Sequence, residues 1–355
     1  MGTAADGVAD GQGDSHHHSN ATLYQVIHGI KDASKFAKLI DEYPSIVKLL
    51  NSTSGPNHTV FVPLDVAFEH IPKHHKPSKE FVEEVLLYHI GVGSYPARRI
   101  LGTHTIPTAL NASRLGGDAQ RLRTRVGLGG ARVNFYSKIV AIDKPASNGI
   151  VHGVSSIIVP PPAVGPELSL FPDKFSTLLL AYGKTHFVEY IHAVKMVGST
   201  VFAPTNNAFS RLGPKVNAFL FNTRTGLKYL DAILKYHIVA NATLYSDAFY
   251  DHSSSSSNGA SSGGDVEAER SQHFDLTTLL HDVHVGVDIG RVLGFVTMRV
   301  NGFTHVAVQD GIAANGVIQV LDKVLIPPHK NHGGLSVSDD MTVEELRERL
   351  DAYLD

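Results

Sequence analysis

No cysteine occurs anywhere in this sequence of 355 residues. This absence excludes disulfide bonds, thiolate metal sites and catalysis by a thiol. The sequence also lacks an apolar run long enough to cross a membrane, a recognisable signal peptide and an apolar C-terminal anchor signal. We therefore expect no membrane span in this chain.

The sequence motifs of common enzymes are missing as well. There is no G-x-S-x-G nucleophile motif, no Walker phosphate-binding loop and no H-E-x-x-H zinc motif. The 21 histidines show no metal-ligand pattern, because His281 and His284 would lie on opposite faces of a strand and proline interrupts the segment 70–76. We predict no catalytic residue, no cofactor and no metal site.

The charge distribution argues against nucleic acid as a partner. The formal net charge is −3, and acidic and basic residues are interspersed without a basic stripe. The chain is 43% hydrophobic and 18% charged, which is an ordinary globular balance. Its length suffices for two domains with separate cores.

An internal duplication divides the sequence into two similar halves. The decapeptide TVFVPLDVAF at 59–68 returns as TVFAPTNNAF at 200–209, with six of the ten residues identical. The segment LLYHI in the first half returns as LKYHI in the second, and residues 133–161 align with 300–328 without a gap. Three matched blocks in the same order, about 150 residues apart, indicate two copies of a whole domain.

Each copy is predicted to begin with helices and to end with strands. The decapeptide has the pattern of a short buried strand, after which Asp65 in the first copy and Asn206 in the second can cap a following helix. Asn-Gly pairs at 148–149 and 315–316 are strong hairpin signals between alternating apolar segments. The pattern predicts an α+β fold with an antiparallel sheet and with helices packed early in each domain.

Composition locates the domain boundaries. We expect a disordered N-terminal tail over 1–21 and domains over 22–162 and 173–328. A proline-rich linker at 163–172 should be extended and stiff. The Ser/Gly run at 253–264 is interpreted as a flexible loop inserted in the second domain.

The C-terminal tail, 329–355, contains a short amphipathic helix. Thr342 and Glu345 fit a capping box at its start. One apolar stripe is predicted along the helix, formed by Val343, Leu346, Leu350 and Leu354. We expect the helix to dock on the second domain or on a partner.

The matched blocks resemble the fasciclin family, whose domain is called FAS1. The resemblance rests on the order TVFAPTNNAF, YHI and NGVIQVLDKVLIPP, and on TVFVPLDVAF, YHI and NGIVHGVSSIIVPP in the first copy. It implies two tandem FAS1-like domains, each a compact β-wedge with helices packed on it, and a secreted or surface-displayed protein that acts in adhesion or matrix binding. The chain departs from the family pattern at Leu64, Asn206 and Asn207. It departs again at Gln319, where the family often has the histidine kept as His152.

The resemblance also implies an adhesive role for two Tyr-His pairs, Tyr88–His89 and Tyr236–His237. The local sequence favours another interpretation, because the spacing of apolar residues places both histidines on the apolar face of a helix. A core-facing histidine is usually a hydrogen-bonded structural residue. We expect both histidines to be buried and neutral, and both tyrosines to lie at the edge of that face, where a hydroxyl can be exposed.

Five N-x-S/T sequons point to the secretory pathway. Together with the resemblance, they favour a secreted or cell-surface glycoprotein whose signal peptide is absent from this chain. The candidates for glycosylation are Asn20, Asn51, Asn57, Asn111 and Asn241.

Three classes of function remain at this point. The first is a non-enzymatic extracellular adhesion protein that binds a cell-surface protein, a matrix protein or a wall polysaccharide. The second is a lumenal or vacuolar membrane-associated factor in membrane fusion or trafficking, which a membrane anchor would favour. The third is an enzyme on a FAS1 scaffold, which a deep pocket with strongly shifted titratable groups would favour.

Overall fold

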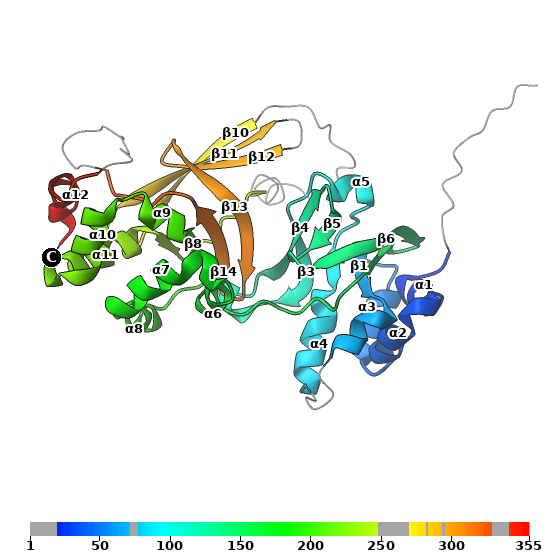
Figure 1. Cartoon of the computed structure of the whole chain (residues 1–355). Coiled ribbons are helices and arrows are strands. Elements are labelled where there is room, and N and C mark those ends of the chain that lie inside the picture. Colours follow the sequence, from blue (N-terminus) through cyan, green and yellow to red (C-terminus); the bar gives the residue numbers. More distant parts are fainter. Residues whose placement is uncertain are drawn as a thin grey trace, which may run out of the picture.

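The computed structural model of the chain contains two domains that lie side by side, each with a seven-stranded sheet (Figure 1). Most helices lie on the outer side of each domain, α6 lies beside β14 near the middle, and the sheets lie toward the middle of the molecule. The structure describes residues 20–71, 77–247, 270–281, 283–292, 295–328 and 341–354. Most of the expected N-terminal tail and the Ser/Gly run at 253–264 lie outside these residues.

Domain 1 begins with helices and ends with strands, as the sequence predicts. Its helices are α1 (Leu23–His28), α2 (Ser34–Asp41), α3 (Pro44–Asn51), α4 (Lys79–Tyr88) and α5 (Ala97–Ile100), with short 3₁₀ turns at Lys31–Ala33, Asp65–His70 and Ser113–Leu115. Its strands are β1 (His58–Pro63), β2 (Ile90–Val92), β3 (Thr105–Asn111), β4 (Ala119–Gly127), β5 (Gly130–Val133), β6 (Ser137–Ala146) and β7 (Gly149–Val154). The strands form a closed barrel in chain order.

Domain 2 repeats this organisation. Its helices are α6 (Val164–Ser169), α7 (Pro172–Lys184), α8 (Phe187–Ala193), α9 (Asn206–Ser210), α10 (Pro214–Asn222), α11 (Arg224–Tyr236) and α12 (Val343–Leu350), followed by a 3₁₀ turn at Asp351–Tyr353. Its strands are β8 (Ser199–Pro204), β9 (Ile238–Ala240), β10 (Arg270–Thr277), β11 (His284–Val292), β12 (Phe295–Val300), β13 (Thr304–Ala313) and β14 (Gly316–Leu321). The order in the sheet is β10-β11-β12-β13-β14-β8-β9.

The duplication predicted from the sequence is visible in the strands. In the ungapped alignment, β6 and β7 begin and end at the same positions as β13 and β14. In both hairpins the asparagine is the second of two turn residues, and the glycine that follows it begins the next strand. The strand order is also the same, except that an isolated bridge between Val239 and Thr278 joins β9 to β10.

The sheets are not wholly antiparallel, which corrects the sequence interpretation. β1 pairs with β7 in parallel, and β8 pairs with β14 in parallel. The first and last strands of a domain are separated by nearly its whole length, so their pairing is free of the tight-turn constraint that makes hairpins antiparallel. The α+β class itself is as expected.

A buried asparagine in the first Asn-Gly turn ties the helices to the sheet. Asn148 accepts a hydrogen bond from the N–H of Leu23 through Oδ1 (2.8 Å). Its side-chain amide donates to the carbonyl oxygens of Leu50 (2.9 Å) and Ser52 (2.8 Å). The turn therefore holds α1 and the end of α3 against the strands, in addition to reversing the chain.

Asp65 and Asn206 bond to a helix that precedes them, not to the following helix as predicted. The Asp65 carboxylate accepts from the N–H of Lys35 at the start of α2 (2.8 Å). Asn206 inserts into α7, where it accepts from the N–H of Thr177 (2.8 Å) and donates to the carbonyl oxygen of Asp173 (3.0 Å). These partners are distant in sequence and meet only in the folded domain.

The connection between the domains is partly helical, which corrects the expectation of an extended linker. Helix α6 occupies most of it, and Val164 and Leu168 are buried in the core of domain 2. The N–H of Val164 also donates to Oδ1 of Asn315 in the second Asn-Gly turn (2.9 Å). The prolines at 160–162 lie before this helix and outside it, and burial of Val164 and Leu168 against domain 2 stabilises the helical segment that follows them.

The C-terminal helix is part of domain 2. Helix α12 has the capping box that the sequence indicates, with reciprocal hydrogen bonds between Thr342 and Glu345. Leu346 and Leu350 are fully buried in the domain 2 core. Helix α12 thus packs against α10 and α11.

We predict that Gly149→Ala strongly destabilises domain 1. A Cβ at this position would lie 1.9 Å from the carbonyl oxygen of His58, which is backbone and has little freedom to move. The expected loss in the free energy of unfolding is about 2 kcal/mol or more, measured by chemical denaturation. Gly127→Ala is the control, because a Cβ there meets nothing within 4 Å. An equal effect of the two substitutions would contradict the close approach.

Candidate functional site

Both Tyr-His pairs lie at the end of a helix, with the histidine in the core. His89 follows α4 and is fully buried; its Nδ1–H donates to the carbonyl oxygen of Val85 (2.7 Å), and its Nε2 accepts from the N–H of Ile158 (3.0 Å). His237 makes the equivalent pair of bonds after α11 (2.7 and 2.9 Å). One neutral tautomer satisfies both bonds, and burial lowers the pKa of each histidine to about 4.

The two tyrosine hydroxyls are buried, which differs from the expectation that they lie at an exposed edge. The Tyr88 hydroxyl donates to the carbonyl oxygen of Arg121 (2.9 Å) and accepts from the amide of Asn134 (2.8 Å). The Tyr236 hydroxyl accepts from the amide of Asn301 in the same way (3.0 Å). Each pair thus joins a helix to the sheet, and an adhesive role for these residues stays a prediction that their burial does not support.

All five candidate glycosylation sites are exposed. Asn241 has left-handed backbone geometry (φ 58°), and its Oδ1 accepts from the N–H of Val197 (2.8 Å). Exposure is a requirement for glycan attachment, while use of the sequons stays a prediction. The exposed asparagines are Asn20, Asn51, Asn57, Asn111 and Asn241.

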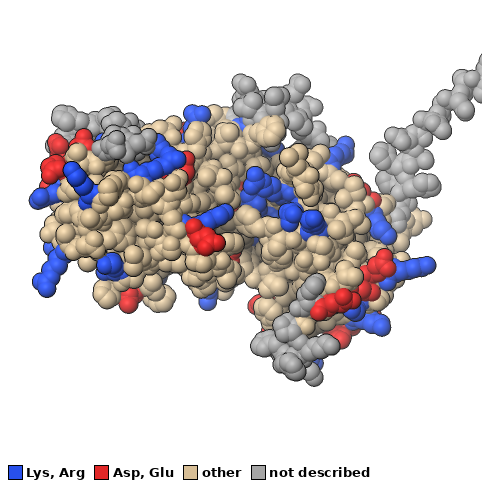
Figure 2. Space-filling view, viewed as in Figure 1, with Lys and Arg blue, Asp and Glu red and all other residues tan. Residues whose placement is uncertain are grey.

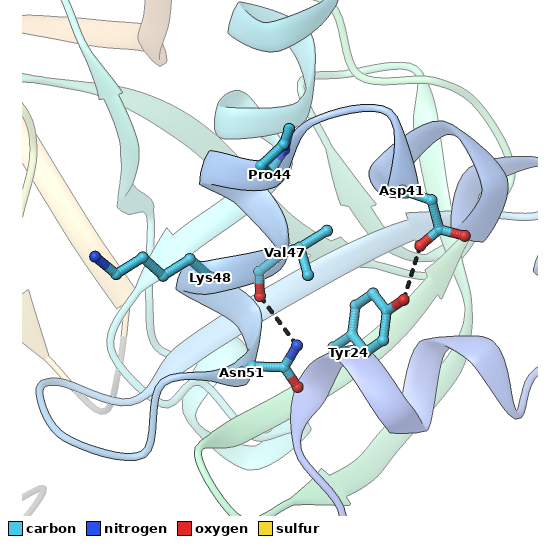
Figure 3. Close-up of a pocket in the computed structure, with 6 residues that line it drawn as sticks. All are labelled: Tyr24, Asp41, Pro44, Val47, Lys48 and Asn51. Atoms are coloured by element: carbon cyan, nitrogen blue, oxygen red, sulfur yellow. Dashed lines mark hydrogen bonds between the residues drawn. The ribbon is translucent and has the colours of Figure 1, made fainter.

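A shallow groove of about 410 Å³ lies among the first helices of domain 1 (Figure 3). The Tyr24 hydroxyl on its wall donates to the carboxylate of Asp41 (2.9 Å), which also contacts Nε2 of His28 (3.1 Å). A glycan on Asn51, which lines the groove, would cover it. Because these polar groups already bond to one another, the groove makes a weak ligand site.

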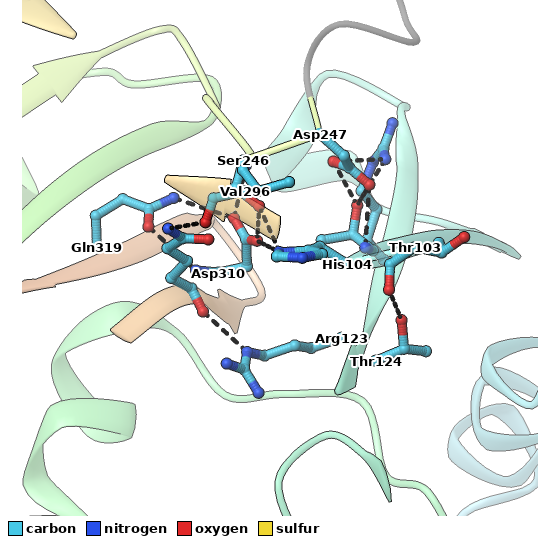
Figure 4. Close-up of polar contacts among 12 residues, drawn as sticks. Thr103, His104, Arg123, Thr124, Ser246, Asp247, Val296, Asp310 and Gln319 are labelled. Atoms are coloured by element: carbon cyan, nitrogen blue, oxygen red, sulfur yellow. Dashed lines mark hydrogen bonds and ion pairs between the residues drawn. The ribbon is translucent and has the colours of Figure 1, made fainter. Parts of the chain in front are cut away.

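A network of polar side chains crosses from one domain to the other (Figure 4). The strand β4 of domain 1 packs along β13 of domain 2. Nε of Arg123 donates to the carbonyl oxygen of Gln309 (2.8 Å), and the amide of Gln120 donates to the carbonyl oxygen of Ala313 (3.2 Å). The domains are therefore joined by specific hydrogen bonds as well as by the connecting segment.

A buried carboxylate forms one centre of this interface. Asp247 of domain 2 accepts from the N–H (3.0 Å) and the hydroxyl (2.7 Å) of Thr105 in domain 1. Nη1 of Arg121 lies 3.7 Å from the same carboxylate. Burial raises the pKa of Asp247 to about 6, and the neighbouring arginine opposes this shift.

A second centre brings together a serine, a histidine and an aspartate. The backbone N–H of Ser246 donates to Asp310 (2.8 Å), its hydroxyl donates to the same carboxylate, and Nδ1 of His104 lies 3.1 Å from that hydroxyl. In nucleophilic catalysis the histidine stands between the serine and the carboxylate. Here Ser246 is fully buried and bonds directly to Asp310, so this arrangement is suited to holding the domains together.

Sequence reasoning missed this interface, because its residues form no local motif. One signal was present: Arg121, Arg123 and Arg125 alternate along β4 and must share one face of the strand. Alternating arginines are also common on solvent-exposed strands, so this pattern alone does not predict a domain interface. In the folded chain, Nη1 of Arg121 lies 3.7 Å from the carboxylate of Asp247 in domain 2, and Arg123 donates to the carbonyl oxygen of Gln309 in β13.

The described residues add two negative findings. Within the described ranges, no group of three or more His, Asp or Glu side chains is placed to hold a metal ion. In the same part of the chain, every helix is too short or too polar to cross a membrane.

We predict that His89→Ala destabilises domain 1 by about 2–4 kcal/mol, through a cavity and the loss of the acceptor for the buried N–H of Ile158. Denaturant titration measures this change. The exposed His192 is the control, and its replacement by alanine should change the free energy of unfolding by less than about 0.5 kcal/mol. Full stability of His89→Ala together with lost binding would instead make the histidine a contact residue.

The same experiment has a pH dependence. The pKa of His89 is about 4 in the folded state and about 6.5 in an unfolded chain, so the unfolded state binds the proton first on acidification. Its contribution to stability is fully present above about pH 6.5 and is lost as the pH falls toward the folded-state pKa of about 4. The His89→Ala variant should lose less stability than the native protein across that interval.

We predict that Asp247→Ala loosens the contact between the domains. The substitution removes the acceptor of two hydrogen bonds from the buried Thr105 and should destabilise the interface by about 1–3 kcal/mol. Small-angle X-ray scattering and denaturation detect separation of the domains. Asp231→Ala is the control, because its ion pair with Lys235 (2.8 Å) lies on a partly exposed helix and contributes only about 0.3–0.5 kcal/mol. Identical behaviour of both variants would contradict the assignment of Asp247.

Comparison with known proteins identifies the family. The fasciclin domain family matches residues 31–160 and 173–327. The aurofusarin biosynthesis cluster protein S of Gibberella zeae is 30% identical over 329 residues, which is 89% of this chain and 79% of that protein. Stabilin-2 of Rattus norvegicus is 26% identical over 207 residues, which is 53% of this chain and 14% of that much longer protein.

The fold can also be compared with a solved structure. It is the FAS1 domain pair from the insect cell adhesion molecule Fasciclin I, which aligns with 17% identity and a TM-score of 0.40 over 83% of this chain and 97% of that chain. The family match covers both halves of the duplicated sequence, and the two halves share one strand order. The chain therefore belongs to the fasciclin domain family and contains two fasciclin domains in tandem.

Proposed function

We propose that this protein is a non-enzymatic binding protein of the cell surface or extracellular matrix. The proposal rests on the location of four side chains whose residue types can act in catalysis. His89, His237, Ser246 and Asp310 are buried, and each is engaged in hydrogen bonds that hold elements or domains together. Buried groups of this kind stabilise the fold, and a partner would contact the exposed residues instead.

The junction between the domains supports one rigid binding unit. Two weak modules on a flexible linker bind more tightly together only through effective concentration. In this chain the connecting helix α6 is packed on domain 2, and β4 is bonded to β13. Surfaces on both domains are thus offered to a partner in one fixed arrangement, which lowers the entropy lost on binding.

We also propose that the protein is secreted or displayed on the cell surface. The support is the exposure of all five sequon asparagines together with membership of the fasciclin domain family. A vacuolar or lumenal location is the alternative, since glycosylation would take place on that route as well.

A second candidate function is suggested by the relative from Gibberella zeae, which by its name belongs to a biosynthesis cluster. Under this candidate, the chain is a non-catalytic component of a biosynthetic assembly. Removal of the gene from its native host, followed by analysis of the secreted metabolites, separates the two functions. Loss of one metabolite with unchanged adhesion would favour the second candidate.

We expect the full chain to be retained by a matrix or cell-wall fraction, without turnover of that material. Asp247→Ala should weaken retention if both domains contact the partner, whereas Asp231→Ala should leave it unchanged. A pull-down with quantified bound protein, repeated with soluble fractions as competitors, measures this. Turnover that a single substitution abolishes in a folded variant would contradict a non-enzymatic function.

A further inference from the structure

One face of domain 1 carries three cationic side chains in cross-strand register, which we name the cationic face. Arg125 of β4 lies opposite Arg132 of β5, and Arg132 lies opposite Lys138 of β6. Cross-strand partners point to the same side of a sheet, and neighbouring strands are about 4.8 Å apart. Arg125 and Lys138 are exposed, and Arg132 is half-buried. Figure 2 shows Lys and Arg side chains gathered over this part of domain 1, beside the junction with domain 2.

Like charges that lie directly opposite each other destabilise a sheet. Among the described residues, none of the three cations forms an ion pair with a carboxylate. The cationic face therefore carries a repulsion that the described part of the domain does not neutralise.

Domain 2 provides an internal comparison. The equivalent register there joins Asp288 of β11 to Arg299 of β12, and Arg299 to His305 of β13. Arg132 and Arg299 are the residues directly before the two ranges of the ungapped alignment, so they correspond to each other. The central arginine is thus kept in both domains, but its neighbour is an acid in domain 2 and a second arginine in domain 1. The same fold does not require the cationic arrangement.

An aromatic ring lies beside the cationic face in a backbone conformation that disfavours it. Phe135 has a φ of 66°, and the residue is 44% exposed. The corresponding residue of domain 2 is Gly302 with a φ of 79°, and glycine adopts this geometry without the steric cost that other residues meet. Strained backbone of this kind gathers at functional positions.

The surrounding structure holds this aromatic residue in place. The buried Asn134 (φ 47°) accepts from the N–H of Arg123 (2.9 Å) and donates to the hydroxyl of Tyr88 (2.8 Å). The Arg123 guanidinium lies 4.2 Å from the centroid of the Phe135 ring. Arg123 and Arg125 share one side of β4, so the ring lies on the side of the cationic face.

We propose that the cationic face and Phe135 bind an acidic polysaccharide. This inference rests on the proposed function and names the partner of one surface. Guanidinium groups bind carboxylate or sulfate groups through paired hydrogen bonds, and a row of cations at regular spacing suits a chain with a regularly repeated anion. The aromatic face suits the C–H face of a sugar ring. Membranes and nucleic acids are bound by more extended basic surfaces, with about four or more cations.

The test replaces Arg125 and Phe135 by their counterparts from domain 2. In the full chain, Arg125→Asp should weaken binding of polygalacturonate by roughly tenfold or more, while its thermal unfolding temperature is unchanged or raised because a repulsion is removed. Phe135→Gly should also weaken binding, in a backbone position that glycine tolerates. Lys138→Gln provides a milder loss of charge. Arg98→Asp, at an exposed position of α5 in the same domain, is the matched control and should bind normally.

Binding is measured by calorimetry at increasing ionic strength, with dextran as the neutral polysaccharide. Salt should weaken the binding of polygalacturonate, because exposed charges are screened. Equal binding by Arg125→Asp, Lys138→Gln and the native protein would overturn the proposal, and so would equal binding of dextran. Tighter binding of single-stranded RNA or of phosphatidylserine vesicles through the same residues would overturn it in favour of those ligands. Retention by a matrix fraction without binding of polygalacturonate would contradict this inference alone, whereas no retention by any fraction would contradict the proposed function.

Discussion

Each domain depends on one buried histidine that connects the end of a helix to the chain beyond the last strand. The ring of His89 bonds to Val85 within α4 and to Ile158 after β7, and His237 repeats this arrangement in domain 2. Only the neutral ring supplies one donor and one acceptor, so the low pKa is a consequence of the structural role. The neighbouring tyrosine extends the connection to the strands of the sheet.

The Tyr88–His89 pair also positions strand β4, which carries the arginines of the domain interface and of the cationic face. Tyr88 bonds to the backbone of β4 at Arg121 and to Asn134 in the turn after β5. Along β4, Arg121 and Arg123 enter the domain interface, where acceptors in domain 2 satisfy them. Buried charges are stable only with such partners. Arg125 lies beyond the interface and remains exposed, so a single strand serves both cohesion and the proposed binding.

The two domains show how one fold accommodates different surfaces. Residues that form the turns or the buried hydrogen bonds are alike in the two domains, as at the two Asn-Gly turns. His152 bonds to the carbonyl oxygen of Tyr95 in domain 1, whereas Gln319 bonds to Leu244 and Asp310 in domain 2. In domain 2, Asp310 belongs to the interface with domain 1, and Gln319 therefore donates to an interface residue where His152 bonds within its own domain.

Features that depend on nearby residues were predictable from the sequence. The Asn-Gly hairpins, the capping box of α12 and the burial of both histidines follow from backbone preference and apolar spacing over a few positions. The repeated blocks predicted two domains, because motifs that recur in the same order indicate a duplicated domain even when no tertiary contact is known.

Tertiary structure alone decided where side chains find partners far along the chain. Asp65 and Asn206 suit a following helix by local rules, yet they bond to earlier helices that the fold brings beside them. The tyrosine hydroxyls are buried because a strand covers them, and the linker is helical because domain 2 buries its apolar residues. The three cations are separated by six or more positions in the sequence and become neighbours only through strand register. Local preference is a property of short segments, whereas burial, register and charge pairing depend on which segments meet.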